Sequence, residues 1–334
     1  MPWMSSRLVA DLNEAQLEAV THTGGPLLVV AGAGSGKTRV ITRRIAWLTE
    51  QGTPPEHVLA LTFSTKAAEE MRVRAEELIE PPYEELFCST FHAFCARLLL
   101  DEASEAGVDP FFHPVTPADR LALLIDKLDD LSLRHLVTWG NRAGLLANLI
   151  ERIDRLKDEG VTAADYARWA ESLEPTGPEH DPERAERELE FARFYSEHDR
   201  VLERAGALDF GELILRVTRM LNERAHVRRR VTDRFRAVLV DEYQDTNYAQ
   251  QELLQLLVDD HRNVCVVGDD DQSIYRFRGA SRKNIVDFQR RYPDAKLVRL
   301  ELNYRSSQTI LDAAHAVIAP SEGRLPKRLI SASS

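Results

Sequence analysis

The sequence predicts an α/β fold in which helices cover a parallel β-sheet and a long helical segment is inserted between its strands. Four short apolar runs, each followed at once by polar residues, have the composition of strands buried on both faces. A glycine-rich turn and a helical pattern follow the first run, which indicates a strand–loop–helix unit. Between about residues 91 and 208, long helical patterns replace the apolar runs and no convincing strand is present.

The four predicted strands cover residues 27–30, 58–63, 238–240 and 264–267. The helix expected after the first strand carries apolar residues on one face, at Val40, Ile41, Ile45 and Leu48. Ligands of such sheets bind beyond the carboxyl ends of the strands. The polar residues that follow the four runs are therefore where we expect the chemistry. In the inserted segment we expect helices over residues 118–131, 145–157 and 183–204, and an exposed loop over the Pro-rich, acidic residues 172–188.

Composition is that of an ordinary globular chain, with 43% hydrophobic and 29% charged residues. The N-terminus lacks an apolar signal core and no run approaches the roughly 18 apolar residues of a membrane helix, so we expect a cytoplasmic protein with no membrane partner. The three cysteines have no metal-binding spacing, and we interpret them as reduced thiols: Cys88, Cys95 and Cys265. The net charge of −11 argues against a generic nucleic-acid binder, but a local basic channel could still bind DNA, so composition does not decide.

Residues 31–38, with the sequence AGAGSGKT, follow the first predicted strand and have the spacing of a phosphate-binding loop. Three glycines allow backbone N–H groups to turn inward around an anion: Gly32, Gly34 and Gly36. Lys37 would bring a positive charge to the β- and γ-phosphates of ATP, and Thr38 would supply a hydroxyl ligand to Mg²⁺. The first position departs from the usual pattern, because Ala31 stands where glycine is expected. A glycine-rich turn with an exposed lysine is the alternative, and the strand before the loop and the helix after it disfavour that alternative.

Two carboxylates and a glutamine complete the predicted catalytic set. Asp241 and Glu242 follow the third predicted strand, where Asp241 would hold Mg²⁺ and Glu242 would act as general base toward the attacking water. Alone, this pair could be a solvated strand end, but together with the phosphate loop it completes one Mg·ATP site. Gln272 follows the fourth strand, where it could sense whether the γ-phosphate is present.

Seven segments occur in the order that one family of motor proteins uses: residues 12–20, 31–38, 62–71, 89–94, 241–245, 268–280 and 302–306. They are similar to the Q motif, a Walker A motif with a leading alanine, motif Ia, a Thr-Phe-His motif, and motifs II, III and IV. On these motifs the chain resembles the UvrD/Rep/PcrA-like DNA helicases of superfamily 1 over most of its length.

The resemblance implies a RecA-like P-loop NTPase sheet with an inserted all-helical subdomain and a partial second RecA-like domain. It places a RecA-like ATP-binding domain (1A-like) at residues 1–90 and 209–280, a 1B-like helical subdomain at 91–208, and the first segment of a 2A-like second motor domain at 281–334. The family's later motifs lie well beyond motif IV, so we expect the second motor domain to be incomplete. For the isolated chain we therefore expect weak ATP binding, little DNA-stimulated turnover and no unwinding.

The resemblance also assigns roles at the nucleotide. Gln16 would read the adenine edge, Arg39 and Tyr304 would flank the adenine ring, and Arg305 would reach the γ-phosphate as a finger. The full predicted nucleotide-binding set is Gln16, Ala31, Gly32, Ala33, Gly34, Ser35, Gly36, Lys37, Thr38, Arg39 and Tyr304. The predicted catalytic residues are Lys37, Glu242, Gln272 and Arg305, and the predicted metal ligands are Thr38 and Asp241.

A further set would contact single-stranded DNA or the tail of a 3′-tailed duplex: Thr62, Phe63, Thr90, His92, Tyr275, Phe277 and Arg278. Aromatic faces hold unpaired bases by stacking without sequence preference. The alternative for each aromatic residue is ordinary core packing. Two positions depart from the family pattern, because Phe277 stands where tryptophan is usual and Thr65 stands where asparagine is common.

The resemblance implies the N-terminal part of an ATP-dependent DNA helicase or translocase, 3′-to-5′ in the complete protein, acting in repair or replication, with repair proteins among its expected partners. Two alternatives remain open. One is a nucleotide-gated DNA-binding regulatory module that does not unwind DNA, and the other is the motor part of a RecB-like helicase–nuclease. A P-loop kinase of small substrates would not explain motif III, the Thr-Phe-His segment and residues 303–305 together.

Overall fold

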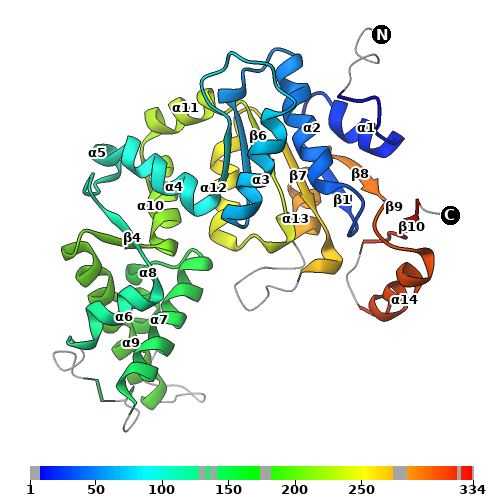
Figure 1. The fold of residues 1–334 in the computed structure, drawn as a ribbon. Coiled ribbons are helices and arrows are strands. Elements are labelled where there is room, and N and C mark those ends of the chain that lie inside the picture. The colour runs from blue at the N-terminus through cyan, green and yellow to red at the C-terminus, as the bar shows by residue number, and fades with distance from the viewer. Residues whose placement is uncertain are drawn as a thin grey trace. The chain divides into compact units, whose positions relative to one another are not determined.

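In the computed structural model, a parallel β-sheet lies at the centre of the part of the chain that carries the glycine-rich loop at residues 31–38 (Figure 1). Within the residues that the structure describes (8–127, 133–134, 136, 141–173, 182–273, 284–321 and 325–332), it has six strands in the order β3-β2-β6-β7-β1-β8. These are β1 Leu27–Ala31, β2 Val58–Thr62, β3 Phe87–Thr90, β6 Ala237–Val240, β7 Val264–Gly268 and β8 Lys296–Leu300. Every neighbouring pair is parallel, so the carboxyl ends meet at one edge. The predicted α/β class with a parallel sheet is confirmed.

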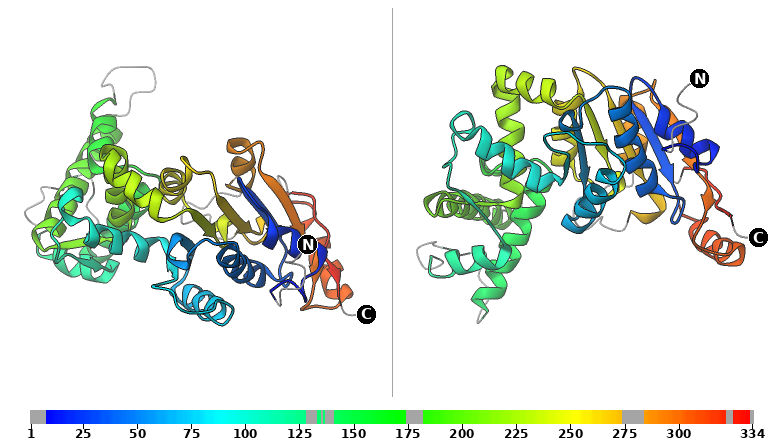
Figure 2. Two further views of the ribbon diagram at one scale, coloured as in Figure 1. Left: turned by 90° about the horizontal axis from the view of Figure 1, so that it is seen from above. Right: turned by 45° about the horizontal axis from the view of Figure 1, so that its top comes forward.

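The chain divides into two compact units. The first, which contains the sheet, consists of Met1–Ala93, Ala225–Asn247 and Leu254–Ser334, and the second consists of Phe94–Arg224 and Tyr248–Leu253. Helices of the first unit are α1 Glu14–Thr21, α2 Lys37–Glu50, α3 Thr65–Glu76, α11 Ala225–Arg234, α13 Asn284–Arg291 and α14 Gln308–Ile318. Helices α4 Phe91–Asp101 and α12 Tyr248–Val258 contain residues of both units. Figures 1 and 2 show α2 and α3 on one face of the sheet and α13 on the other.

Burial explains why the apolar runs form strands. All five residues of β1 and all five of β2 are buried. The predicted apolar face of α2 packs into the same core, where Val40, Ile41 and Ile45 are fully buried. Full burial of such a side chain contributes about 1.5–3 kcal/mol, which is far more than strand or helix propensity supplies. The four predicted strands are thus confirmed, although β2 ends at Thr62, one residue before the predicted end.

Two strands of the sheet were not predicted, and both lie at its edges. β3 contains the polar residues Ser89 and Thr90, and β8 alternates between exposed and buried positions. Edge strands have one unpaired side and tolerate such polar patterns, so they lack the continuous apolar signal of the central strands. β8 also lies within residues 281–334, which we assigned to the second motor domain, yet it pairs with β1 from Lys296 to Leu300. A domain boundary at residue 280 would cut this sheet.

The second unit is mainly helical. Its helices are α5 Ala103–Ala106, α6 Pro117–Ile125, α7 Arg142–Asp158, α8 Ala163–Glu171, α9 Pro182–Arg204 and α10 Phe210–Glu223. α7 buries one face, whose residues recur with helical spacing: Leu146, Leu149, Ile150 and Ile153. This face packs in one hydrophobic cluster with Phe191 and Phe194 of α9. None of the helices in the described part of the chain combines the length and the apolar character that a membrane span needs.

The second unit differs from the prediction in three details. β4 His113–Val115 and β5 Ala207–Asp209 form a short parallel pair where no strand was expected, because three residues are too few to give a strand pattern. α6 ends at Ile125, short of the predicted end at residue 131. Residues 183–188 were expected both in the last helix and in the Pro-rich loop, and they belong to α9, which begins at Pro182, a residue compatible with a helix start. Residues 174–181 of the predicted loop lie outside the described residues.

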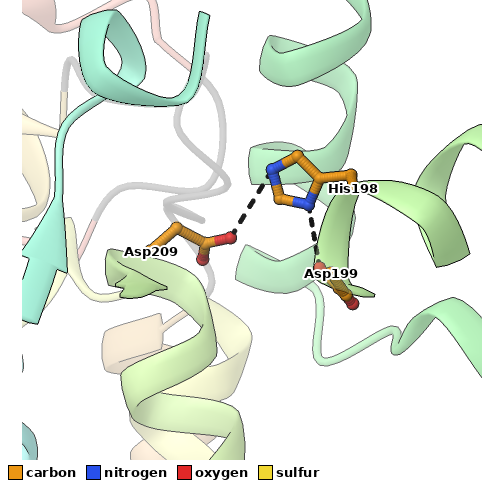
Figure 3. Close-up of side chains that lie close together, drawn as sticks. All are labelled: His198, Asp199 and Asp209. Atoms are coloured by element: carbon orange, nitrogen blue, oxygen red, sulfur yellow. Dashed lines mark hydrogen bonds and ion pairs between the residues drawn. The ribbon is translucent and has the colours of Figure 1, made fainter. Parts of the chain in front are cut away.

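A buried ion cluster joins α7, α9 and the start of α10 within this unit. The Lys157 side chain is 0% exposed, and its Nζ lies 2.9 Å from Asp199 Oδ1, 2.8 Å from Asp209 Oδ2 and 3.0 Å from Glu212 Oε2. Figure 3 shows His198 between the two aspartates, with Nδ1 2.9 Å from Asp199. These three residues could in principle ligate a metal ion. Because the Lys157 ammonium contacts both carboxylates, we interpret the cluster as an ion network. Burial alone would raise the pKa of Asp209, but Lys157 holds it well below its usual range.

Replacing Lys157 with methionine keeps the length of the side chain but removes the ammonium that contacts three carboxylates. Breaking a buried ion pair on one side typically costs about 3–5 kcal/mol, so we expect a loss of that size in the free energy of unfolding, measured by urea denaturation. Arg155→Met is the matched control, because Arg155 lies on the same helix and pairs with Glu151 while 61% exposed. That change is expected to cost less than about 1 kcal/mol. Equal losses in the two variants would contradict the ion-network interpretation.

Candidate functional site

The loop between β1 and α2 lies at the carboxyl edge of the sheet and is tightly surrounded. Gly34 has φ +71° and Gly36 has φ +91°, a region that favours glycine. A Cβ on Gly34 would lie 2.7 Å from the Asn303 Nδ2 atom, and one on Gly36 would lie 2.7 Å from Gln16 Nε2. Ala31 is the buried last residue of β1, so the departure from the usual pattern falls inside the strand. Both the backbone angle and the close neighbours require glycine in this loop.

Gln16 is hydrogen-bonded to the backbone of the loop. Its side chain is fully buried, and Nε2 donates a hydrogen bond of 3.0 Å to the Ser35 carbonyl. The Oε1 atom accepts from the Asn13 backbone N–H, as part of a capping box at the start of α1. Ser35 in turn donates from Oγ to the Gly32 carbonyl at 2.7 Å. The structure therefore places Gln16 against the loop, while its predicted contact with adenine stays a prediction.

The predicted lysine and general base form an ion pair. Lys37 Nζ lies 2.7 Å from Glu242 Oε2, and the two side chains are 12% and 32% exposed. Asp241 is buried beside them, and burial together with the Glu242 charge raises its pKa to about 6. Thr38 follows Lys37 in the first turn of α2 and is partly buried. The structure thus brings Lys37, Asp241 and Glu242 together, as their positions after parallel strands predict.

Glu242 has an unusual backbone. It is a non-glycine residue with φ +50°, at the point where β6 turns into a short 3-10 helix, Tyr243–Asp245. Its N–H donates to the Asp241 carboxylate at 3.0 Å. Holding such a residue in the left-handed region costs on the order of 1–3 kcal/mol, and strain of this kind concentrates at functional sites. In this conformation the Glu242 carboxylate forms its ion pair with Lys37.

Gln244, which was not predicted, links Glu242 to the end of β7. The side chain is 1% exposed, and Nε2 donates to Glu242 Oε2 at 2.8 Å. The Oε1 atom accepts from the Asp269 backbone N–H at 2.9 Å. Gln272, the predicted sensor, donates from Nε2 to the carboxylate of Asp269. A glutamine inside motif II was the available sequence signal, but its partner Asp269 is 25 residues away and could not be read from it.

Lys327 is a second residue that the sequence prediction missed. Its side chain is 3% exposed and forms ion pairs with Asp269 and Asp270, and with Asp271 at 3.2 Å. The three carboxylates could hold a cation, and the Lys327 ammonium already lies among them. Burial would lower the pKa of Lys327, but Asp269 and Asp270 raise it above the usual value, so the side chain stays charged. A cavity of about 400 Å³ is lined by residues of this group and of the phosphate loop, among them Gly32, Ala33, Asp269, Gln272 and Lys327.

Motif IV contacts the phosphate loop directly. Asn303 is 1% exposed and donates from Nδ2 to the Ala33 carbonyl at 2.6 Å, and the Tyr304 N–H donates to the Gly34 carbonyl at 3.0 Å. Asn303 Oδ1 also accepts from the Arg305 N–H at 2.8 Å, which fixes the backbone of the predicted finger beside the loop. This segment, β9 Leu302–Asn303, pairs in parallel with β10 Ile330–Ser331.

The residues predicted to flank adenine are both accessible. Tyr304 is 47% exposed, and its hydroxyl accepts a 2.8 Å hydrogen bond from Asn13 Nδ2. The Arg39 side chain is 48% exposed and lies 3.8 Å from Asp11. Arg305 is also exposed.

Asn303 was missed because a motif identifies a residue without showing that its side chain holds a neighbouring loop.

Four of the predicted DNA-binding residues lie together at the carboxyl ends of β2 and β3. Thr62 and Thr90 are register partners in the sheet, and Phe63 follows Thr62 with 37% of its surface exposed. His92 is partly buried in the first turn of α4. Thr62 is only 1% exposed. The remaining predictions, Tyr275, Phe277 and Arg278, lie outside the described residues.

The model of the UvrD/REP helicase N-terminal domain matches residues 12–293. This chain belongs to the UvrD/REP helicase family. A relative named ATP-dependent DNA helicase PcrA, from Staphylococcus aureus, is 39% identical over 328 residues, and a protein of the same name from Staphylococcus epidermidis has the same identity over the same length.

The chain spans less than half of these UvrD/REP relatives. The matches cover 98% of this chain but 42% of each relative. The family match ends at residue 293, whereas the similarity to the relatives covers nearly all of the chain, which includes motif IV. Membership of the UvrD/REP helicase family rests on these sequence matches alone and is independent of the geometry described above.

The close approach at Gly34 gives a test of the loop geometry. Gly34→Ala would place a Cβ 2.7 Å from both the Arg305 Cβ and Asn303 Nδ2 atoms, so the loop must shift. We expect the affinity for Mg·ADP, measured by fluorescence titration, to fall by at least about tenfold. Gly24→Ala is the matched control, because Gly24 has φ +77° but nothing within 4 Å of its added Cβ. Its backbone strain is similar, at about 1–2 kcal/mol, and it should leave nucleotide affinity unchanged. Equal affinity in the two variants would be inconsistent with this geometry.

Proposed function

We propose that this chain is the ATP-hydrolysing part of a DNA helicase motor that binds Mg·ATP and single-stranded DNA. The observation that carries the proposal is the Lys37–Glu242 ion pair of 2.7 Å at the end of a glycine loop, with the buried Asp241 beside it. A cation, a base and a metal-type carboxylate at the carboxyl edge of a parallel sheet are the groups that phosphoryl transfer to water needs.

The loop fits a polyphosphate, because Gly34 and Gly36 have positive φ and no room for a Cβ. Thr38 and Asp241 offer oxygen donors of the kind that Mg²⁺ prefers. When bound, Mg²⁺ would neutralise charge on the phosphate oxygens. Gln16, Arg39 and Tyr304 would contact the adenine, and the remaining loop residues would bind phosphates through their N–H groups.

The ion pair suggests how the residues exchange partners. Phosphates compete for the Lys37 ammonium, and Glu242 is then released to take a proton from the attacking water. Gln244 keeps a hydrogen bond of 2.8 Å to Glu242 and so holds the base in place after Lys37 leaves. Gln272 and Arg305 would contact the γ-phosphate.

The DNA path would cross the carboxyl ends of β2 and β3. Phe63 is an exposed aromatic residue there. Thr90 is the register partner of Thr62, the residue before Phe63, and His92 follows Thr90 by two positions. Tyr275, Phe277 and Arg278 would extend this path. The 3′-to-5′ polarity and the use of 3′-tailed duplexes come from the family resemblance.

The relatives named PcrA are more than twice as long as the matched region, since the match covers 42% of them. We therefore propose that unwinding requires further segments of the kind that these longer relatives have, and that this chain alone binds Mg·ATP weakly. We also propose a 1A-like domain that includes β8 and ends near Leu300, because β8 completes its sheet. The helical insertion would be 1B-like, and the residues that follow Leu300 would begin a 2A-like domain.

Glu242→Gln tests the assignment of the base. Removing a general base typically lowers the rate by about 10²–10⁴, so we expect single-turnover ATP hydrolysis to fall by at least a hundredfold. Nucleotide binding should be retained or tightened, because Lys37 loses its competing partner. Glu69→Gln, an exposed carboxylate on α3, is the control and should leave the rate unchanged. Retention of hydrolysis in Glu242→Gln would rule out this role.

Phe63→Ala tests the DNA path. Base stacking contributes roughly 1–3 kcal/mol, so the affinity for a single-stranded oligonucleotide should fall by about 5–150-fold in a fluorescence anisotropy titration. Phe111→Ala is the control, because Phe111 is an aromatic side chain that is 88% exposed in the second unit. It should leave DNA affinity unchanged. Equal losses of DNA affinity in the two variants, or no loss in either, would argue against a path over Phe63.

A further inference from the structure

A buried lysine from the end of the chain holds the carboxylates next to the phosphate sensor. The side chain of Lys327 is 3% exposed, as is that of Asp269, and that of Asp270 is 5% exposed. The segment that carries Lys327 is fixed at this point by a second contact, since the Leu325 N–H donates to Asp270 Oδ2 at 2.8 Å. A charged group this deeply buried is costly unless it is paired, so Lys327 and the carboxylates of Asp269 and Asp270 stabilise one another.

The carboxylate of Asp269 is shared between the lysine and the sensor. Its Oδ1 atom accepts from Lys327 Nζ, and its Oδ2 atom accepts from Gln272 Nε2. The backbone of the same residue donates to Gln244, which in turn holds Glu242. One continuous chain of contacts therefore runs from Lys327 through Asp269 to the sensor and to the base.

Lys327 also lies close to the phosphate loop. Gly32, Ala33, Gln272 and Lys327 line the same cavity of about 400 Å³. The next segment of chain reaches the loop too, because Leu329 packs against Gly32. The lysine thus shares a cavity with both the loop and the sensor.

We propose that Lys327 is a positioning residue that allows the site to distinguish ATP from ADP, by holding Asp269 so that Gln272 faces the phosphate loop. The inference rests on the proposed nucleotide-binding function. The ammonium also neutralises the acidic group formed by Asp269, Asp270 and Asp271. Without it, these carboxylates would repel the γ-phosphate, which is the part of ATP that ADP lacks.

The test is a pair of titrations of the full chain, one with Mg·ADP and one with Mg²⁺ and a non-hydrolysable ATP analogue. In Lys327→Met we expect the affinity for the ATP analogue to fall by about tenfold, the size of one charge-assisted hydrogen bond, while that for ADP changes by less than about twofold. Lys327→Arg keeps the charge and should restore most of the preference for the ATP analogue. Equal weakening for both nucleotides, or none, would overturn the inference.

Lys327→Met leaves buried carboxylates without a cation and could unfold the chain. The double variant Asp270→Asn with Lys327→Met removes one of these charges and should fold, yet Asp269 still lacks its cation and the preference should still be lost. Retention of the preference in the folded double variant would also overturn the inference. A wild-type chain that binds neither nucleotide would refute the proposed function itself. A wild-type chain that binds both, with variants that behave identically, would refute only the role of Lys327.

Discussion

The ion pair between Lys37 and Glu242 is the contact on which the rest of the site depends. Parallel strands bring their carboxyl ends to one edge, so the residue after the β1 loop and the residue after β6 meet there. Two carboxylates, Asp241 and Glu242, would repel each other at this edge without a cation, and the pKa of Asp241 is raised to about 6 by burial together with that repulsion. Lys37 relieves the repulsion through its ion pair with Glu242, and the same charge is suited to phosphates.

Local patterns predicted the parts of the fold and site that are formed by neighbouring residues. The apolar runs predicted the central strands because those strands are buried on both faces, and the glycine spacing predicted the loop because positive φ requires glycine. The edge strands β3 and β8 were missed because their burial is partial. Gln244, Asn303 and Lys327 were missed because their partners lie far away in the chain, up to 270 residues for Asn303 and Ala33.

Each unit contains a lysine buried among three carboxylates. Lys157 joins helices of the second unit, and Lys327 joins the last described segment of the first unit to the end of β7. Both arrangements cost desolvation, and both are stable only while every partner is present. The first holds helices in place and shares no residue with the predicted sites. The second lines a cavity together with the phosphate loop, and for that reason we connect it with nucleotide binding.

The most direct test of the account is a crystal structure of this chain with Mg²⁺ and a non-hydrolysable ATP analogue. The account predicts that Lys37 leaves Glu242 and contacts the β- and γ-phosphates, with Asp241 and Thr38 near the metal and Gln272 facing the γ-phosphate. A nucleotide bound elsewhere, with the 2.7 Å pair of Lys37 and Glu242 intact, would contradict it.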